Sequence, residues 1–124
     1  MPRYFTLDEA NQALAAIRPL VQKILALRAE IIALRPEIWP VVEKAAGNGG
    51  RKAASEIVQE FDKLDDAVRQ IQSAGVLVKD INTGLLDFPS LRDGRAVYLC
   101  WQYDEPEIFY WHEVDTGFAR RQPL

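Results

Sequence analysis

The 124-residue sequence has one cysteine and one histidine, and this scarcity sets the first limits on its chemistry. A single cysteine cannot form a disulfide within the chain. The N-terminal residues MPRYFTLDEA lack the apolar core of a secretory signal peptide. Together these two features predict a cytoplasmic protein.

Long apolar runs are also missing. Charged residues interrupt even the stretch ILALRAEIIALRPEIW, so no segment reaches the roughly 20 unbroken apolar residues of a membrane span. We therefore expect no membrane insertion. Hydrophobic residues make up 48% and charged residues 27% of the chain, which is ordinary for a folded domain. A chain of this length supports one hydrophobic core, so we predict a single domain over residues 1–124.

An excess of basic residues is absent as well. The formal net charge is −3, and the acidic excess lies in residues 76–124, which carry eight acidic and five basic residues. Five acids follow one another there without an intervening Lys or Arg: Asp104, Glu105, Glu107, Glu113 and Asp115. Because such a segment repels a phosphate backbone and attracts cations, we expect no nucleic-acid partner.

The N-terminal third carries a helix start signal and then a heptad pattern. Thr6 and Glu9 form a capping-box pair, which predicts a helix that begins there. Apolar residues then recur every seven positions, typical of a coiled coil with Ile at a and Leu at d. The a positions are Ile17, Ile24, Ile31, Ile38 and Ala45, and the d positions are Leu20, Leu27, Leu34 and Val41. We predict a long helix over residues 6–46.

Prolines interrupt this long helix. Pro19 and Pro36 each remove a backbone donor, so we expect kinks or a break, with the break near Arg35. Pro36 is tolerated if it opens a new helical piece, although Pro40 then falls inside that piece. The segment ends at the glycine cluster 47–50, which we interpret as a turn between two helices.

A second helix is predicted over residues 52–74. Its apolar residues alternate in steps of four and three, and Gly75 is placed to cap its C-terminus. These apolar residues are Ile57, Phe61, Leu64, Val68 and Ile71. The short connection makes the two helices antiparallel neighbours, which together form a long helical hairpin.

Beyond Gly75 the pattern changes to alternation with β-branched residues, which predicts a small β module over residues 76–124. The Asp93–Gly94 pair is typical of a tight turn between strands. The last hairpin pairs residues 96–103 with residues 108–113, with opposed residue numbers that sum to about 211. This register places Cys100 and His112 on opposite faces, and a slip of one residue would bring them to the same face.

The C-terminal segments GLLDFPSLRDGRAVYLCW, EPEIFYWH and DTGFARRQPL resemble the signature of a small prokaryotic family known as domain of unknown function 2203. The resemblance extends through the whole chain from RYFTLDEAN onward. It implies a shared architecture and a shared site but no particular chemistry.

Residues 95–121 hold seven of the twelve aromatic residues together with the only Cys and the only His, which marks a candidate site. Thiolate, imidazole and carboxylate are all zinc ligands, so one hypothesis is a divalent metal site. Its candidate ligands are His112, Glu107, Asp115 and Cys100. The alternatives are a structural role, with Cys100 in the core and His112 bonded to a carboxylate, or catalysis with Cys100 as nucleophile and His112 as base.

A further hypothesis is an aromatic platform that binds a ligand or peptide, with arginines as anion contacts. Its candidate residues are Trp101, Tyr110, Trp111, His112 and Arg120. Aromatic residues on both faces of a hairpin more often form core and interfaces.

The sequence as a whole predicts an α+β domain, in which the coiled-coil-like helical hairpin supports a small antiparallel sheet packed against the N-terminal half of the first helix. We expect a non-enzymatic interaction or ligand-binding domain that forms a homodimer through its helices. The alternative is a metal-binding protein or metal-dependent enzyme centred on His112 and nearby carboxylates.

Overall fold

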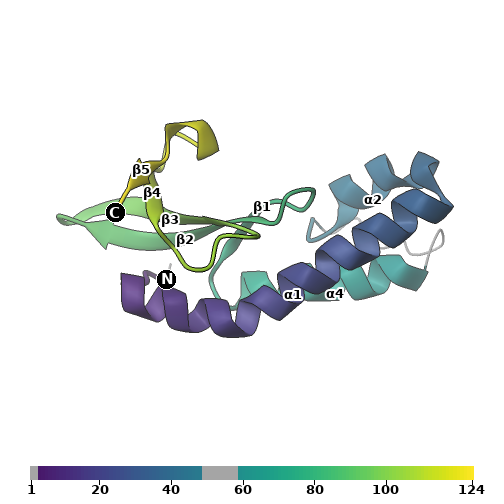
Figure 1. Cartoon of the computed structure of the whole chain (residues 1–124), viewed down its shortest axis with the longest axis horizontal. Helices are drawn as coiled ribbons and strands as arrows, with labels where there is room; N and C mark the ends of the chain where they lie inside the picture. The colour runs from purple at the N-terminus through teal and green to yellow at the C-terminus, as the bar shows by residue number, and fades with distance from the viewer. Residues whose placement is uncertain (1–2, 49–58) are drawn as a thin grey trace.

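The computed structural model describes residues 3–48 and 59–124 and shows an α+β fold (Figure 1). The helical part comprises α1 (Leu7–Leu34), η1 (Pro36–Ile38), α2 (Trp39–Ala45) and α4 (Gln59–Ser73). The second part comprises β1 (Leu77–Asp80), β2 (Leu85–Arg92), β3 (Arg95–Gln102), β4 (Tyr110–Glu113), η2 (Phe118–Arg120) and β5 (Gln122–Pro123). None of the helices in the described part of the chain is long and apolar enough to cross a membrane.

Helix α1 begins as the sequence predicts. The Glu9 amide donates to Thr6 Oγ1 over 3.1 Å, and the Thr6 amide donates to Glu9 Oε1 over 2.8 Å. The helix continues through Pro19 and ends at Leu34.

The kinked helix predicted over residues 6–46 is divided near Arg35, where the sequence predicted kinks or a break. Arg35 adopts a non-helical conformation with φ −146°, which is the expected break before proline. Pro36 then opens a short 3-10 helix, and Pro40 lies in the first turn of α2, where no backbone donor is needed.

Helix α4 packs against α1 with the predicted apolar seam. Its buried apolar residues include Phe61, Leu64, Val68 and Ile71, while Ile57 and the predicted start of this helix lie outside the described residues. The Gly75 amide donates to the Gln72 carbonyl, and the Val76 amide donates to that of Ile71. With Gly75 at φ +88°, these bonds form a Schellman cap that ends the helix.

The heptad positions of α1 and α2 divide into two groups. The a positions from Ile17 to Ala45 are all buried within the chain. Of the d positions, Leu34 is 73% exposed and Val41 is 44% exposed. The a positions thus pack inside one molecule, and the long antiparallel hairpin is reduced to contacts between α1 and the shorter α4.

Five strands of the described chain form one antiparallel sheet in the order β1–β2–β3–β4–β5, a meander as predicted. Figure 1 shows the N-terminal half of α1 beneath one face of this sheet, with the C-terminal η2 beyond the other side. We call the α1 side the core face and the opposite side the outer face. Because side chains alternate along a strand, each strand contributes to both faces.

The core face carries large buried aromatic residues. Phe88 of β2 meets Phe5 edge-on at 5.5 Å between ring centroids, and Trp101 is fully buried with its indole N–H donating to the Glu105 carbonyl. The turn before β2 approaches α1 so closely that a Cβ at Gly84 would lie 2.8 Å from Val21 Cγ1. The sheet is therefore fixed at a defined distance from the helix.

Candidate functional site

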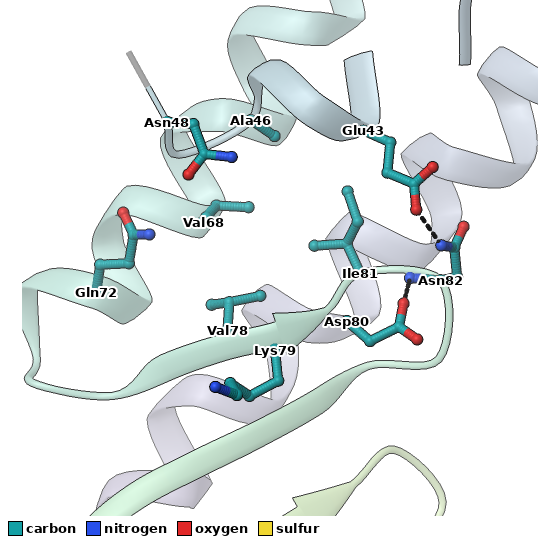
Figure 2. Close-up of a pocket in the computed structure, with 10 residues that line it drawn as sticks. All are labelled: Glu43, Ala46, Asn48, Val68, Gln72, Val78, Lys79, Asp80, Ile81 and Asn82. Carbon is teal, nitrogen blue, oxygen red and sulfur yellow. Dashed lines mark hydrogen bonds between the residues drawn. The ribbon is translucent and has the colours of Figure 1, made fainter. Parts of the chain in front are cut away.

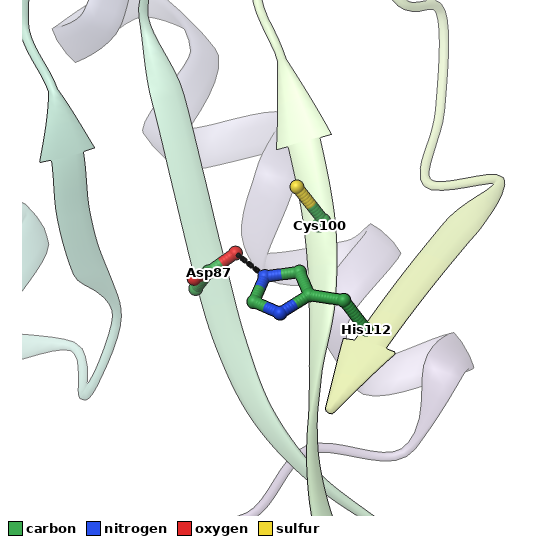
Figure 3. Close-up of side chains that lie close together, drawn as sticks. All are labelled: Asp87, Cys100 and His112. Atoms are coloured by element: carbon green, nitrogen blue, oxygen red, sulfur yellow. Dashed lines mark hydrogen bonds and ion pairs between the residues drawn. The ribbon is translucent and has the colours of Figure 1, made fainter. Parts of the chain in front are cut away.

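The outer face brings together one carboxylate, one thiol and one imidazole from three adjacent strands (Figure 3). Asp87 on β2 is the cross-strand partner of Cys100 on β3, and His112 on β4 pairs with Tyr98, two residues from Cys100. Their potential ligand atoms all lie within 4.8 Å of one another. We call Asp87, Cys100 and His112 the donor cluster.

The donor cluster is buried on the face of the sheet opposite α1. Asp87, Cys100 and His112 are each 0–1% exposed. The Tyr98 ring lies 5.5 Å from the imidazole of His112, and the Arg121 guanidinium lies over the ring of Tyr110, which is the cross-strand partner of Cys100. Side chains of the sheet and of the C-terminal segment thus supply the cover on this face.

Hydrogen bonds fix the orientation of His112 and its proton. Its Nδ1 lies 2.8 Å from the backbone carbonyl oxygen of Glu113, which can only accept, so Nδ1 carries a hydrogen. Its Nε2 lies 2.9 Å from Asp87 Oδ1, as the dashed line in Figure 3 marks. One proton must lie between these two atoms. The Asp87–His112 pair is consequently neutral overall, whichever atom holds that proton.

Cys100 is a neutral thiol in this environment. Burial, and then the neighbouring Asp87 carboxylate, raise the pKa of the Cys100 thiol from its ordinary 9.0 to about 12, while Arg121 acts in the opposite direction. A catalytic thiolate needs an exposed, electropositive setting with a lowered pKa. The geometry therefore argues against Cys100 as a nucleophile activated by His112.

The cluster has the chemistry of a metal site with an open position. Carboxylate, thiolate and imidazole are zinc ligands, and three protein ligands leave a fourth position for water or another ligand. Metal-bound histidines usually donate their second N–H to a carbonyl or carboxylate, and His112 Nδ1 makes a bond of this kind to the Glu113 carbonyl. A metal would take the place of the proton on Nε2 and of the thiol proton.

Comparison with known families decides the membership of the chain. Residues 3–124 match the model of a family described as an uncharacterized conserved protein, DUF2203. The chain belongs to the DUF2203 family. The comparisons with curated proteins and with solved structures found no match. The match covers the helices and the sheet alike, and it confirms the resemblance seen in the sequence.

The structure corrects the predicted register of the last hairpin in this DUF2203 chain. Tyr98 pairs with His112 and Leu99 with Trp111, so the residue numbers sum to 210 and not to 211. The connection is a loop over residues 103–109 in place of a four-residue turn. Ile108 leaves the ladder and is buried, and its amide donates to Asn11 Oδ1 on α1. This shift by one residue moves Cys100 and His112 to the same face.

The aromatic platform candidates are divided between the two faces. Trp101 and Trp111 are 0% and 6% exposed and lie on the core face, whereas Tyr110 and His112 lie on the outer face. Arg120 is exposed in η2. These side chains therefore form no continuous aromatic surface.

Two predicted metal ligands lie away from the cluster. Glu107 is exposed in the loop between β3 and β4, and Asp115 is exposed in the turn after β4. Neither belongs to the group that gathers around His112 in the described chain.

Asp87 is the cluster residue that is missing from the candidate ligands predicted from the sequence. A signal for its role lies in the tight turn of Asp93 and Gly94, which have φ values of 52° and 77°. A two-residue turn of this kind fixes the register of the flanking strands. Counting back from the pair of Arg92 and Arg95 places Asp87 opposite Cys100.

A separate cavity of about 410 Å³ lies between α2, α4 and the β1–β2 turn (Figure 2). Asn82 lies at its rim, where its side-chain amide donates to Glu43 and its backbone amide donates to Asp80 Oδ1. The Asn82 side-chain oxygen accepts from Arg28 Nε and from the indole of Trp39. These groups satisfy one another, so Asn82 acts as a structural junction between the helices and the sheet.

Proposed function

We propose that this protein binds a divalent transition metal ion, with zinc as the best match, at Asp87, Cys100 and His112. The observation that carries the proposal is the meeting of three different donor side chains, from three adjacent strands, within 4.8 Å in a buried place. Burial of such groups is unfavourable unless they are bonded or bind a metal. The bond from His112 Nδ1 to a carbonyl leaves Nε2 directed toward the other two donors.

Zinc is favoured by the donor types. Magnesium and calcium prefer oxygen ligands, whereas a thiolate with an imidazole suits zinc. A free thiol in this position also fits the reducing cytoplasm expected from the sequence. The open fourth position is the arrangement of catalytic zinc sites, so any enzymatic activity would be metal-dependent.

Elemental analysis of protein purified without a metal-affinity tag tests this proposal. We expect one zinc per chain after dialysis against limiting zinc, and loss of this zinc in His112→Ala and in the nearly isosteric Cys100→Ser. Glu107→Gln and Asp115→Asn are matched controls, because these exposed acids lie in the same region of the chain. Circular dichroism checks that each variant is folded. Equal zinc content in all four variants, or none in the native protein, would refute the proposal.

A second candidate function is self-association through the helices, and the exposure of two heptad d positions favours it. Leu34 is 73% exposed and Val41 is 44% exposed, although both belong to an apolar seam. We expect a homodimer that sedimentation equilibrium detects at micromolar concentration and that Leu34→Lys dissociates. A native monomer at that concentration would eliminate this candidate.

A further inference from the structure

Arg121 presents an unused hydrogen-bond donor beside the donor cluster. Its side chain is only 9% exposed, and its buried Nε has no hydrogen-bond partner among the residues that the structure describes. Burying a charged donor without an acceptor is unfavourable, and buried polar groups are almost always paired. The unpaired Nε–H of Arg121 therefore indicates a binding position for an acceptor.

The contacts of Arg121 fix its guanidinium in a way that leaves Nε free. The guanidinium carbon lies 4.0 Å from the centroid of the Tyr110 ring and 4.6 Å from that of Phe118. Its Nη2 donates to Glu105 Oε2. The other carboxylate oxygen of Glu105 accepts from the backbone N–H of Gln102 over 2.6 Å. Glu105 is therefore shared between two donors and does not pair with both sides of the guanidinium fork.

Arg121 is close to the donor cluster. Tyr110, on which its guanidinium stacks, is the cross-strand partner of Cys100. The side chains that cover the cluster thus include a cation with a spare donor.

We propose that Arg121 is the anion-binding half of the same site, where a small oxyanion, of the carboxylate or phosphate type, bonds to Nε and occupies the open position of a metal held by the donor cluster. This inference rests on the proposed metal binding. Charge-assisted hydrogen bonds from Arg to carboxylate and phosphate oxygens are strong. The cluster is 0–1% exposed, so an anion bound there is enclosed by protein and has to be small.

Cobalt-substituted protein tests the inference, since the visible absorption of cobalt reports on its ligands. Acetate and inorganic phosphate are titrated separately, which distinguishes the two classes of anion. We expect one of them to change the cobalt spectrum saturably in the native protein. Arg121→Gln should lower the affinity for this anion by about tenfold or more, and the neighbouring Arg120→Gln should leave the affinity unchanged.

Two further variants separate ligand binding from a structural role. Arg121→Lys keeps the positive charge but loses the forked N–H donors of the guanidinium, so it should also weaken anion binding. Glu105→Gln keeps an oxygen that can accept from the backbone N–H of Gln102, but it removes the negative charge that competes with the anion for Arg121. This variant should therefore bind the anion severalfold more tightly. A purely structural Arg121–Glu105 pair predicts no such gain.

The outcomes distinguish this inference from the metal proposal. Absence of bound cobalt would refute the metal proposal and this inference with it. Stoichiometric cobalt with no response to either anion would refute the inference alone. Equal loss of anion affinity in Arg121→Gln and Arg120→Gln, or weaker anion binding in Glu105→Gln, would also overturn the inference.

Discussion

The two faces of the sheet are built from alternate residues of the same strands, yet their chemistry is opposite. Phe88, Leu99 and Trp101 make the core face apolar where α1 covers it. On the outer face, opposite α1, Asp87 and Cys100 occupy the intervening positions and are buried just as deeply. Apolar burial stabilises a fold, whereas a buried ion pair adds little net stability. We therefore assign stability to the core face and function to the outer face.

The largest expected effect comes from removing a core-face aromatic residue. Phe88→Ala should lower the free energy of unfolding by about 3–5 kcal/mol, because it deletes a fully buried ring and leaves a cavity. Urea denaturation measures this loss. Leu91→Ala on the same strand is the control, since Leu91 is 55% exposed on the outer face and should change stability by less than about 0.5 kcal/mol. Similar losses in both variants would remove the distinction between the faces.

The second effect concerns the coupling between Asp87 and His112 in metal-free protein. Asp87→Asn and His112→Gln should each lower the free energy of unfolding by roughly 1–3 kcal/mol, since each leaves a buried partner with a weaker bond. The double variant should lose less than the sum of the single losses, with a coupling of roughly 0.5–3 kcal/mol. Additive losses in this double-mutant cycle would show that the 2.9 Å contact contributes nothing specific.

The third effect is confined to alkaline pH. The fold raises the pKa of the Cys100 thiol from 9.0 to about 12, so the neutral thiol is favoured in the folded state. The resulting stability is fully present below pH 9 and is lost as the pH rises from about 9 toward about 12. The stability of metal-free native protein relative to Cys100→Ala should therefore fall over this range. Thermal unfolding of both proteins at a series of pH values measures this fall. A difference in stability that stays constant with pH would contradict the burial of the Cys100 thiol.

Much of the helical architecture follows from the sequence because its signals are local. Thr6 and Glu9 predict the start of α1, Pro36 predicts the break after it, and Gly75 predicts the end of α4. Each depends on backbone groups within a few residues. The family resemblance likewise depends on contiguous segments, and the match over residues 3–124 confirms it.

The site was harder to predict because it depends on strand register. A one-residue error in the β3–β4 pairing separated Cys100 from His112, since the loop between these strands is not a tight turn and Ile108 leaves the ladder to pack against α1. By contrast, the two-residue turn at Asp93–Gly94 fixes the β2–β3 register and contains the information that places Asp87 beside Cys100. The residues that matter come from three strands, and no single segment contains them all.

Metal binding at the donor cluster is tested most directly by anomalous diffraction at the zinc absorption edge from crystals of native protein grown with limiting zinc. We predict one strong peak on the outer face of the sheet, within bonding distance of Asp87, Cys100 Sγ and His112 Nε2. A peak at the exposed acids Glu107 or Asp115, or no peak while the Asp87–His112 hydrogen bond remains intact, would contradict it.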